Sequence, residues 1–169
     1  MRITPAIILA LGALLSLPAQ SETPTLPYRM KAAAPELGSN IKRDGITSRL
    51  PYDKTYAELS EKDKAVVRSV YPDMKADDEP PFPARGFKQI YKTIMEITDK
   101  RPVEGHLDIA ILVDENGNGK SVKVYASPDA EVTKIVAMMM MQEKYKPALC
   151  NGQSCVQEFP FEMRFIFTH

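Results

Sequence analysis

The chain has few of the residues and patterns that would assign a function directly. It holds 169 residues with only two histidines, and its 22 lysines and arginines equal its 22 aspartates and glutamates. This balance gives no basic surface of the kind that binds nucleic acid, so we expect no nucleic-acid partner. Neither His106 nor His169 has a serine or cysteine nucleophile at a recognisable spacing. We therefore expect no catalytic residues and no enzymatic activity.

The two cysteines are too few for a four-cysteine zinc site. Cys150 and Cys155 have four residues between them, which excludes a CxxC redox pair. Asn151 and Gly152 predict a turn that lets the two thiols face each other across a hairpin at disulfide distance. We predict a Cys150–Cys155 disulfide and no cofactor.

A long apolar run is also missing. Arg2 is followed by an apolar stretch from Ala6 to Leu17, which is shorter than the roughly 20 residues that cross a membrane. Small residues at Ala19 and Ser21 suit a cleavage site. We predict that residues 1–21 form a cleaved signal peptide and that the mature protein lies in the periplasm without a stable membrane anchor. Retention as an anchor is the alternative.

The sequence pattern changes twice before the last half of the chain, at residue 22 and at residue 60. Residues 22–59 mix prolines, glycines and scattered charge without a period, which predicts a loosely structured arm. Ser60 and Asp63 form a capping-box pattern that predicts a short helix, followed by an acidic turn, over residues 60–79. We expect this helix to pack on the main domain through the apolar residues Val66, Val67, Val70 and Tyr71.

Residues 80–169 show a clear order of elements. Apolar side chains at spacings of three and four predict a helix; they are Phe87, Ile90, Tyr91, Ile94 and Ile97. Alternation from Leu107 to Val113 predicts a strand, and the segment DENGNGK from Asp114 to Lys120 predicts a turn into a second antiparallel strand. A second helix is expected to begin with Ser127 as its cap and Pro128 in its first turn.

The last strand is predicted from apolar residues at alternate positions. Phe159, Phe161, Met163, Phe165 and Phe167 share one face, which we expect to lie against a helix. Pro160 lacks a backbone donor and is tolerated best where a strand has a free edge. The predicted class is α+β, with a small antiparallel sheet of three to four strands packed against two helices.

Five segments in this order resemble the C-terminal domain of TonB. They are FPARGF at Phe82 to Phe87, the strand ending in VDENGNGK, SPDAEV at Ser127 to Val132, YKPALCNG at Tyr145 to Gly152, and the final aromatic strand. The resemblance covers residues 80–169. It implies a periplasmic module that binds an extended peptide of an outer-membrane transporter or envelope protein by strand addition and supports TonB-dependent transport.

The resemblance and the final strand together place the partner-binding residues. The last strand would pair with the guest through Arg164, Phe165, Ile166 and Phe167. Phe82, Pro83, Ala84 and Arg85 would form an accessory contact with the folded receptor. The partner is a protein or peptide, with an outer-membrane TonB-dependent transporter as one candidate and a second copy of the chain as another.

Two other interpretations stay open. A structural protein of the cell envelope could use the same fold for protein–protein contacts. A periplasmic metal-binding protein could use the turn from Asp114 to Gly119 or the methionines from Met138 to Met141. The calcium-loop pattern has Tyr125 where a glutamate is required, and four consecutive methionines point around a helix rather than toward one ion. We therefore predict no metal site.

Overall fold

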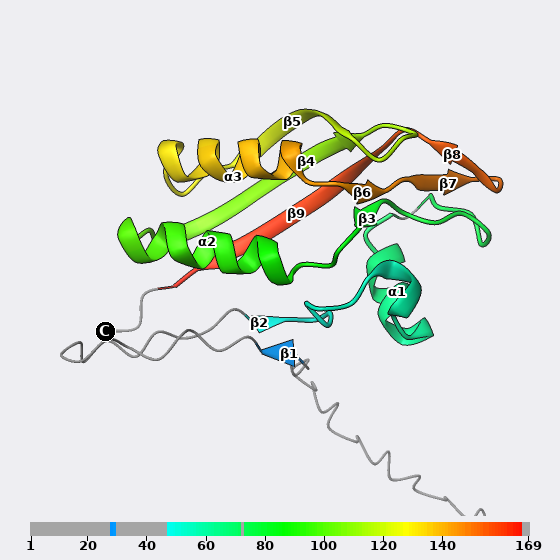
Figure 1. The fold of residues 1–169 in the computed structure, drawn as a ribbon, viewed down its shortest axis with the longest axis horizontal. Coiled ribbons are helices and arrows are strands. Elements are labelled where there is room, and N and C mark those ends of the chain that lie inside the picture. The colour runs from blue at the N-terminus through cyan, green and yellow to red at the C-terminus, as the bar shows by residue number, and fades with distance from the viewer. Residues whose placement is uncertain (1–27, 30–46, 72, 167–169) are drawn as a thin grey trace, which may run out of the picture.

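The computed structural model describes residues 28–29, 47–71 and 73–166 (Figure 1). The predicted signal peptide over residues 1–21 and the predicted contact at Phe167 lie outside these ranges. Among the described residues, no helix has the length and hydrophobicity needed to cross a bilayer. The described part of the chain is α+β, as predicted.

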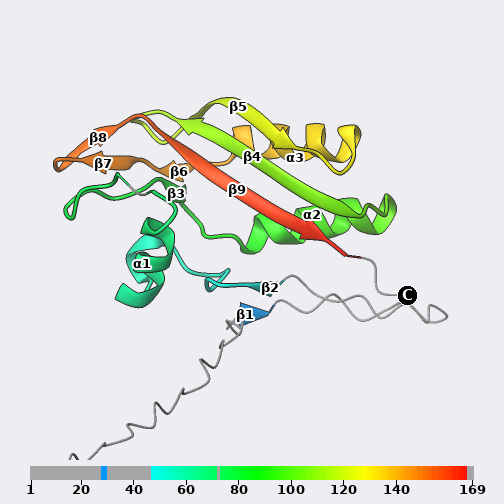
Figure 2. The ribbon, with the colours of Figure 1, turned by 180° about the vertical axis from the view of Figure 1, so that it is seen from behind.

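A three-stranded antiparallel sheet and two helices form the main layers. The sheet has the order β5-β4-β9, made by β5 (Gly119–Ala126), β4 (Gly105–Val113) and β9 (Gln157–Phe165). Figure 1 shows α2 (Lys88–Lys100) and α3 (Ala130–Gln142) on one face of this sheet. Figure 2 shows the same sheet from behind, with no helix over it. The predicted sheet with two helices on it is thus confirmed.

The core lies between these two layers. On β4, Leu107, Ile109, Ile111 and Val113 are fully buried, as the period of two predicts. They meet the inner faces of the helices, which bury Ile90, Tyr91 and Ile94 from α2 and Val132, Val136 and Met140 from α3. Phe159 and Phe161 of β9 complete the cluster, and Phe159 stacks on Phe87 with ring centroids 6.2 Å apart.

The cap of α3 differs from the prediction. Asp129, not Ser127, is the N-cap, because its Oδ1 accepts hydrogen bonds from the backbone N–H groups of Glu131 and Val132 at 3.0 and 2.9 Å. The hydroxyl of Ser127 instead lies 2.7 Å from that of Thr133. Pro128 therefore precedes the cap and lies outside the helix.

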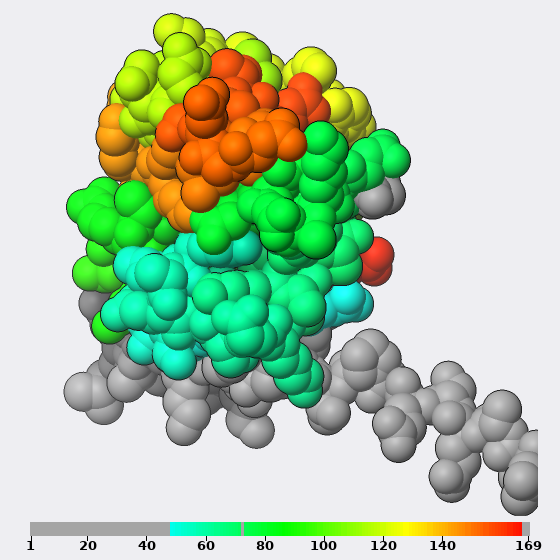
Figure 3. Space-filling model, turned by 90° about the vertical axis from the view of Figure 1, so that its right-hand side faces the viewer, coloured from blue at the N-terminus to red at the C-terminus, as the bar shows by residue number. Residues whose placement is uncertain are grey.

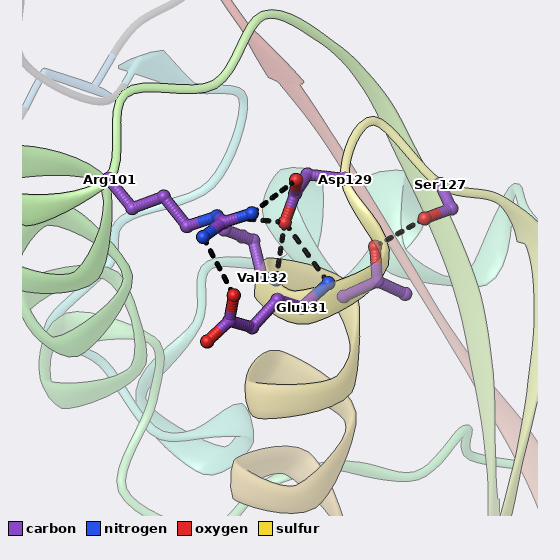
Figure 4. Close-up of polar contacts among 6 residues, drawn as sticks. Arg101, Ser127, Asp129, Glu131 and Val132 are labelled. Carbon is purple, nitrogen blue, oxygen red and sulfur yellow. Dashed lines mark hydrogen bonds and ion pairs between the residues drawn. The ribbon is translucent and has the colours of Figure 1, made fainter.

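Arg101 joins the end of α2 to the start of α3 (Figure 4). Its Nε and Nη2 donate to the two carboxylate oxygens of Asp129 at 3.1 and 3.0 Å, and Nη1 lies 2.7 Å from Glu131 Oε2. Such a two-pronged contact holds the planes of both groups together. The same carboxylate therefore caps one helix and binds the residue that ends the other.

Three two-stranded ladders, two isolated bridges, the helical turn η1 (Tyr56–Glu58) and one short helix, α1 (Glu61–Arg68), complete the described fold. The ladders are β1 (Tyr28–Arg29) with β2 (Thr47–Ser48), β3 (Phe82–Pro83) with β6 (Tyr145–Lys146), and β7 (Ala148–Cys150) with β8 (Gln153–Cys155). The bridges join Glu79 to Leu149 and Asn118 to Lys144. Ser60 caps α1 and accepts a hydrogen bond from the N–H of Asp63, as predicted.

The last part of the segment predicted as an arm, residues 50–59, packs on the main domain. Tyr56 and Leu59 are buried in the main core, and Leu50 and Tyr52 pack against it. The Tyr56 ring lies 5.8 Å from that of Phe82. These apolar contacts make the last part of the predicted arm a piece of the domain. Within α1 and its flank, Val67 is buried as predicted, but Val70 is 58% exposed and does not pack on the domain.

The predicted disulfide joins Cys150 to Cys155 with Cα atoms 5.8 Å apart. Asn151 and Gly152 both have positive φ, of 51° and 78°, which is the geometry of a tight hairpin turn. The hairpin of β7 and β8 lies against the loop that follows α1: Leu149 and Glu79 exchange two backbone hydrogen bonds, and the N–H of Asn151 donates to Asp78. Figure 3 shows the hairpin above this loop, with α1 below.

The disulfide should stabilise the hairpin and the loop beside it. Closing so short a loop stabilises by about 2 kcal/mol in the chain-entropy model. We expect Cys150→Ser with Cys155→Ser to lower the free energy of unfolding by that amount, measured by urea denaturation. In the native protein, thiol alkylation followed by mass measurement should label neither cysteine before reduction. Labelling of both would contradict the assignment.

The stability should fall in acid through Asp129. The hydrogen bond from Arg101 holds the pKa of this carboxyl below its usual range. Because the folded pKa is lower than the unfolded value of about 3.9, the contribution is complete above that pH and is lost as the pH falls through the folded pKa. Urea denaturation between neutral pH and about pH 3 should show a smaller loss for Asp129→Asn than for the unaltered chain. Asp77→Asn, an exposed acid after α1, should keep the full loss.

Candidate functional site

The outer edge of β9 is the surface on which the predicted partner contacts can be tested. β9 is an outer strand of the sheet, and β4 is its only ladder partner among the described residues. Nine residue pairs join the two strands, from Gly105 with Phe165 to Val113 with Gln157. The ladder therefore fixes the register of β9 along its whole length.

Pro160 indicates which backbone groups point outward. It pairs with Ala110 in the middle of the ladder and has no N–H to donate, so its position suits the side of the strand that faces away from β4. The hydroxyl of Tyr71 donates to the carbonyl of Glu158 at 3.0 Å, from outside the ladder. By the period of two, the N–H and C=O groups of Glu162 and Arg164 also point outward.

Tyr71 occupies the outer edge of β9 before Pro160, whereas the edge beyond Pro160 has no partner among the described residues. Burial raises the pKa of the Tyr71 hydroxyl well above its ordinary value, so it remains protonated and keeps donating to Glu158. Beyond Pro160, Glu162, Arg164 and Ile166 are exposed, Ile166 at 70%. No described residue gives these three positions a backbone–backbone hydrogen bond on the outer side.

Aromatic anchors hold the open part in place. Phe161 is buried against Tyr91, with ring centroids 6.4 Å apart, and Phe165 packs partly buried against the core. The side chains on one face are thus fixed while the backbone on the outer side is available. Of the four predicted contacts in this strand, Arg164 and Ile166 are exposed, Phe165 is partly buried, and Phe167 lies outside the described residues.

The predicted accessory contact needs correction. Phe82 is fully buried and Pro83 is buried, because β3 pairs with β6 inside the fold. Ala84 is partly buried and donates its N–H to the carbonyl of Lys144 at 2.8 Å. Only Arg85 reaches the surface, with its side chain 73% exposed and 3.3 Å from Glu143. The aromatic-Pro pair is therefore part of the core in this structure.

The structure also separates the two predicted contact segments. Arg85 precedes Phe87, which stacks on Phe159 near the start of β9, whereas Arg164 lies next to Phe165 at its end. At the usual rise of a strand, Phe159 and Phe165 are about 20 Å apart. One short peptide on the open part of the edge would not reach Arg85.

The turn between β4 and β5 already binds an internal cation. The ammonium of Lys144 donates to the carbonyl of Asn116 at 2.9 Å and to Oδ1 of Asn118 at 2.7 Å. Asp114 accepts hydrogen bonds from the N–H groups of Asn116 and Asn118, and the Asn118 bond is the first cause of its lowered pKa. The oxygens that a calcium ion would need are thus engaged within the turn. No cluster of metal-binding side chains occurs in the described ranges.

Gly117 lets this turn pack closely against the segment that follows α3. It has a φ of 76°, and a Cβ on it would lie 2.0 Å from the carbonyl oxygen of Tyr145. Its own carbonyl accepts the N–H of Tyr145 at 2.9 Å. The turn therefore fastens the segment after α3 to the sheet.

The methionines divide as their helix positions predict. Met140 is fully buried and Met139 packs partly against the core. Met138 is 48% exposed, and Met141 lines a shallow groove beside it. The four side chains thus point in different directions, an arrangement that argues against a copper site built from these methionines.

Neither protein-family models nor curated proteins gave a match to this chain. The resemblance to the TonB C-terminal domain therefore rests on the motifs quoted above. The sequence predicted that Tyr71 packs on the main domain, but not that its hydroxyl donates to Glu158, because the two residues lie far apart in the chain and leave no local signal.

Substitutions at Phe82 and Arg85 should separate a core role from a surface role. Phe82→Ala removes a fully buried ring and should lower the free energy of unfolding by about 3–5 kcal/mol, measured by urea denaturation. Arg85→Ala removes only an exposed ion pair and should change it by less than about 1 kcal/mol. A near-neutral Phe82→Ala would contradict the burial described here.

Proposed function

We propose that this protein is a periplasmic binding module of the TonB C-terminal type, which recognises an extended segment of an outer-membrane transporter or envelope protein by strand addition. The observation that carries the proposal is the open backbone edge from Glu162 to the end of β9 and Ile166 just beyond it. An extended guest pairs with such an edge through main-chain hydrogen bonds. The guest's side chains then add selectivity.

The contacts behind the edge support this function. Phe161 and the ladder with β4 hold the register of β9, so the outward groups of Glu162, Arg164 and Ile166 stand in a fixed row. A guest meeting a preorganised row loses less free energy in ordering the site. Because the Tyr71 hydroxyl already donates to the carbonyl of Glu158, a guest strand would pair with the part of β9 beyond Pro160.

Two features support the proposed compartment. The Cys150–Cys155 disulfide persists in oxidising compartments, and the predicted signal peptide supplies a route of export. The strongest support for the transporter partner is the motif order that resembles TonB. Because the predicted signal is cleaved, the module would act without its own membrane anchor.

A second copy of the chain is another candidate partner for the same edge. Two β9 strands paired antiparallel about Met163 would place Glu162 of one copy opposite Arg164 of the other. Opposite charges across a strand pair stabilise it, and such a contact closes with two-fold symmetry. Sedimentation of the mature protein tests this candidate. A monomer at micromolar concentration would contradict it.

Proline at Glu162 should test strand addition at β9. The N–H of Glu162 points outward, so Glu162→Pro removes a donor from the open edge and leaves the ladder with β4 intact. We expect it to abolish binding of peptides from the N-termini of the same organism's outer-membrane transporters, measured by fluorescence anisotropy. Glu162→Thr keeps the N–H, loses the charge and should retain binding.

Two results would count against the proposal. One is equal peptide binding by Glu162→Pro and the unaltered protein. The other is no binding by the unaltered protein to any of these peptides. Thermal unfolding of both variants checks that the fold is retained.

A further inference from the structure

The opposite edge of the sheet offers a second surface with different chemistry. β5 pairs only with β4 within the described residues. Beside it, a shallow groove of about 400 Å³ runs between β5 and α3. Its lining residues are Val122, Lys134, Ala137, Met138, Met141 and Gln142. The two edges lie on opposite sides of β4 and do not share residues.

The residues of α3 that line the groove form a stripe that extends past the edge strand β5. Lys134, Ala137, Met138 and Met141 recur at spacings of three and four, so they share a stripe of α3. This stripe is distinct from the one that carries Val132, Val136 and Met140 into the core. It provides an apolar surface at the level of the sheet where a further strand would lie.

Gly119 sets the approach of α3 to the start of β5. A Cβ on Gly119 would lie 2.9 Å from the carbonyl oxygen of Met141 and 3.1 Å from its Cα. Only glycine permits this contact without a shift of the helix. This close contact fixes the position of Met141 at one end of the groove.

The register indicates that β5 presents backbone groups to this groove. Because Pro160 makes no ladder hydrogen bond with Ala110, the N–H and C=O groups of Ala110 point toward β5, where Ala110 pairs with Lys123. By the period of two, the N–H and C=O groups of Val122 and Val124 point away from β4. Val122 and Val124 pair with Ile111 and Ile109, so their side chains lie on the helix side of the sheet, where Val122 lines the groove and Val124 is 50% exposed. Their backbone groups point to the open edge.

Three lysines of β5 and α3 decide between the possible occupants of this surface, and Lys134 is the one that lines the groove. Lys120, Lys123 and Lys134 are all exposed. Lys123 forms an ion pair with Glu158 and Lys120 lies 4.0 Å from Asp114, while Lys134 has no ion-pair partner among the described residues. Two β5 strands paired with each other would bring these lysines together, and lysine on an edge strand opposes such self-pairing. An acidic guest would meet complementary charge.

We infer that β5 and α3 form a second binding surface, for an extended acidic segment of a partner protein with apolar residues at alternate positions. The guest's backbone pairs with Val122 and Val124. Its apolar side chains rest on Ala137, Met138 and Met141, on the side of the sheet that carries the helices. Its alternating carboxylates then lie on the opposite side of the sheet, beside Lys123. The guest would thus extend the sheet at the end opposite β9.

The test uses a short fluorescent peptide in which valine alternates with glutamate, and a matched peptide with lysine in place of glutamate. We expect the mature protein to bind the glutamate peptide at least about tenfold more tightly than the lysine peptide, measured by anisotropy at low salt. Amide chemical-shift changes should localise to β5 and α3. Equal affinity for the two peptides, or shifts confined to β9, would overturn the inference.

Variants with matched controls locate the site. Met138→Glu places a negative charge on an exposed groove position and should weaken binding at least about tenfold, whereas Met138→Leu should not. Val124→Pro removes an outward donor and should abolish binding, while Val124→Thr retains it. Glu162→Pro, on β9, should leave this binding unchanged. Unchanged binding by Met138→Glu would overturn the inference even if Val124→Pro does not fold.

Discussion

The pairing of β4 with β9 is the constraint on which the rest of the structure depends. It joins nine residues of each strand across a long stretch of chain and makes β4 the centre of the sheet. The central position buries Leu107, Ile109 and Ile111 completely, and both helices pack on that buried face. Because β4 pairs on both sides, β5 and β9 each have one side with no ladder partner among the described residues. The two candidate binding surfaces are a direct consequence.

Elements fixed by local spacing could be predicted from the sequence. The apolar spacing in α2, the alternation in β4 and the phenylalanines of β9 each describe one buried face, and burial of that face is what forms the element. The Asn-Gly turn and the disulfide were also predictable, since both depend on residues a few positions apart. Pro160 correctly marked an edge strand because the missing N–H is a property of the residue itself.

Features decided by tertiary contacts could not be predicted. Asp129 caps α3 in place of Ser127, and the same carboxylate binds Arg101 at the end of another helix, a contact that no local pattern indicates. Phe82 was expected at the surface but lies in the core, since pairing of β3 with β6 encloses it. Tyr71 reaches Glu158 only after the chain has folded. The groove beside β5 depends on how α3 lies across the sheet, which no local pattern in the sequence determines.

Hydrogen exchange of individual amides in β9 tests the open edge most directly. In the free protein, the N–H groups of Glu162, Arg164 and Ile166 should exchange rapidly, while those of Phe161 and Met163, bonded to β4, exchange slowly. A bound transporter peptide should protect the three rapid amides and leave the slow ones unchanged. Protection of all five in the free protein, or no gain in protection with peptide present, would contradict strand addition at this edge.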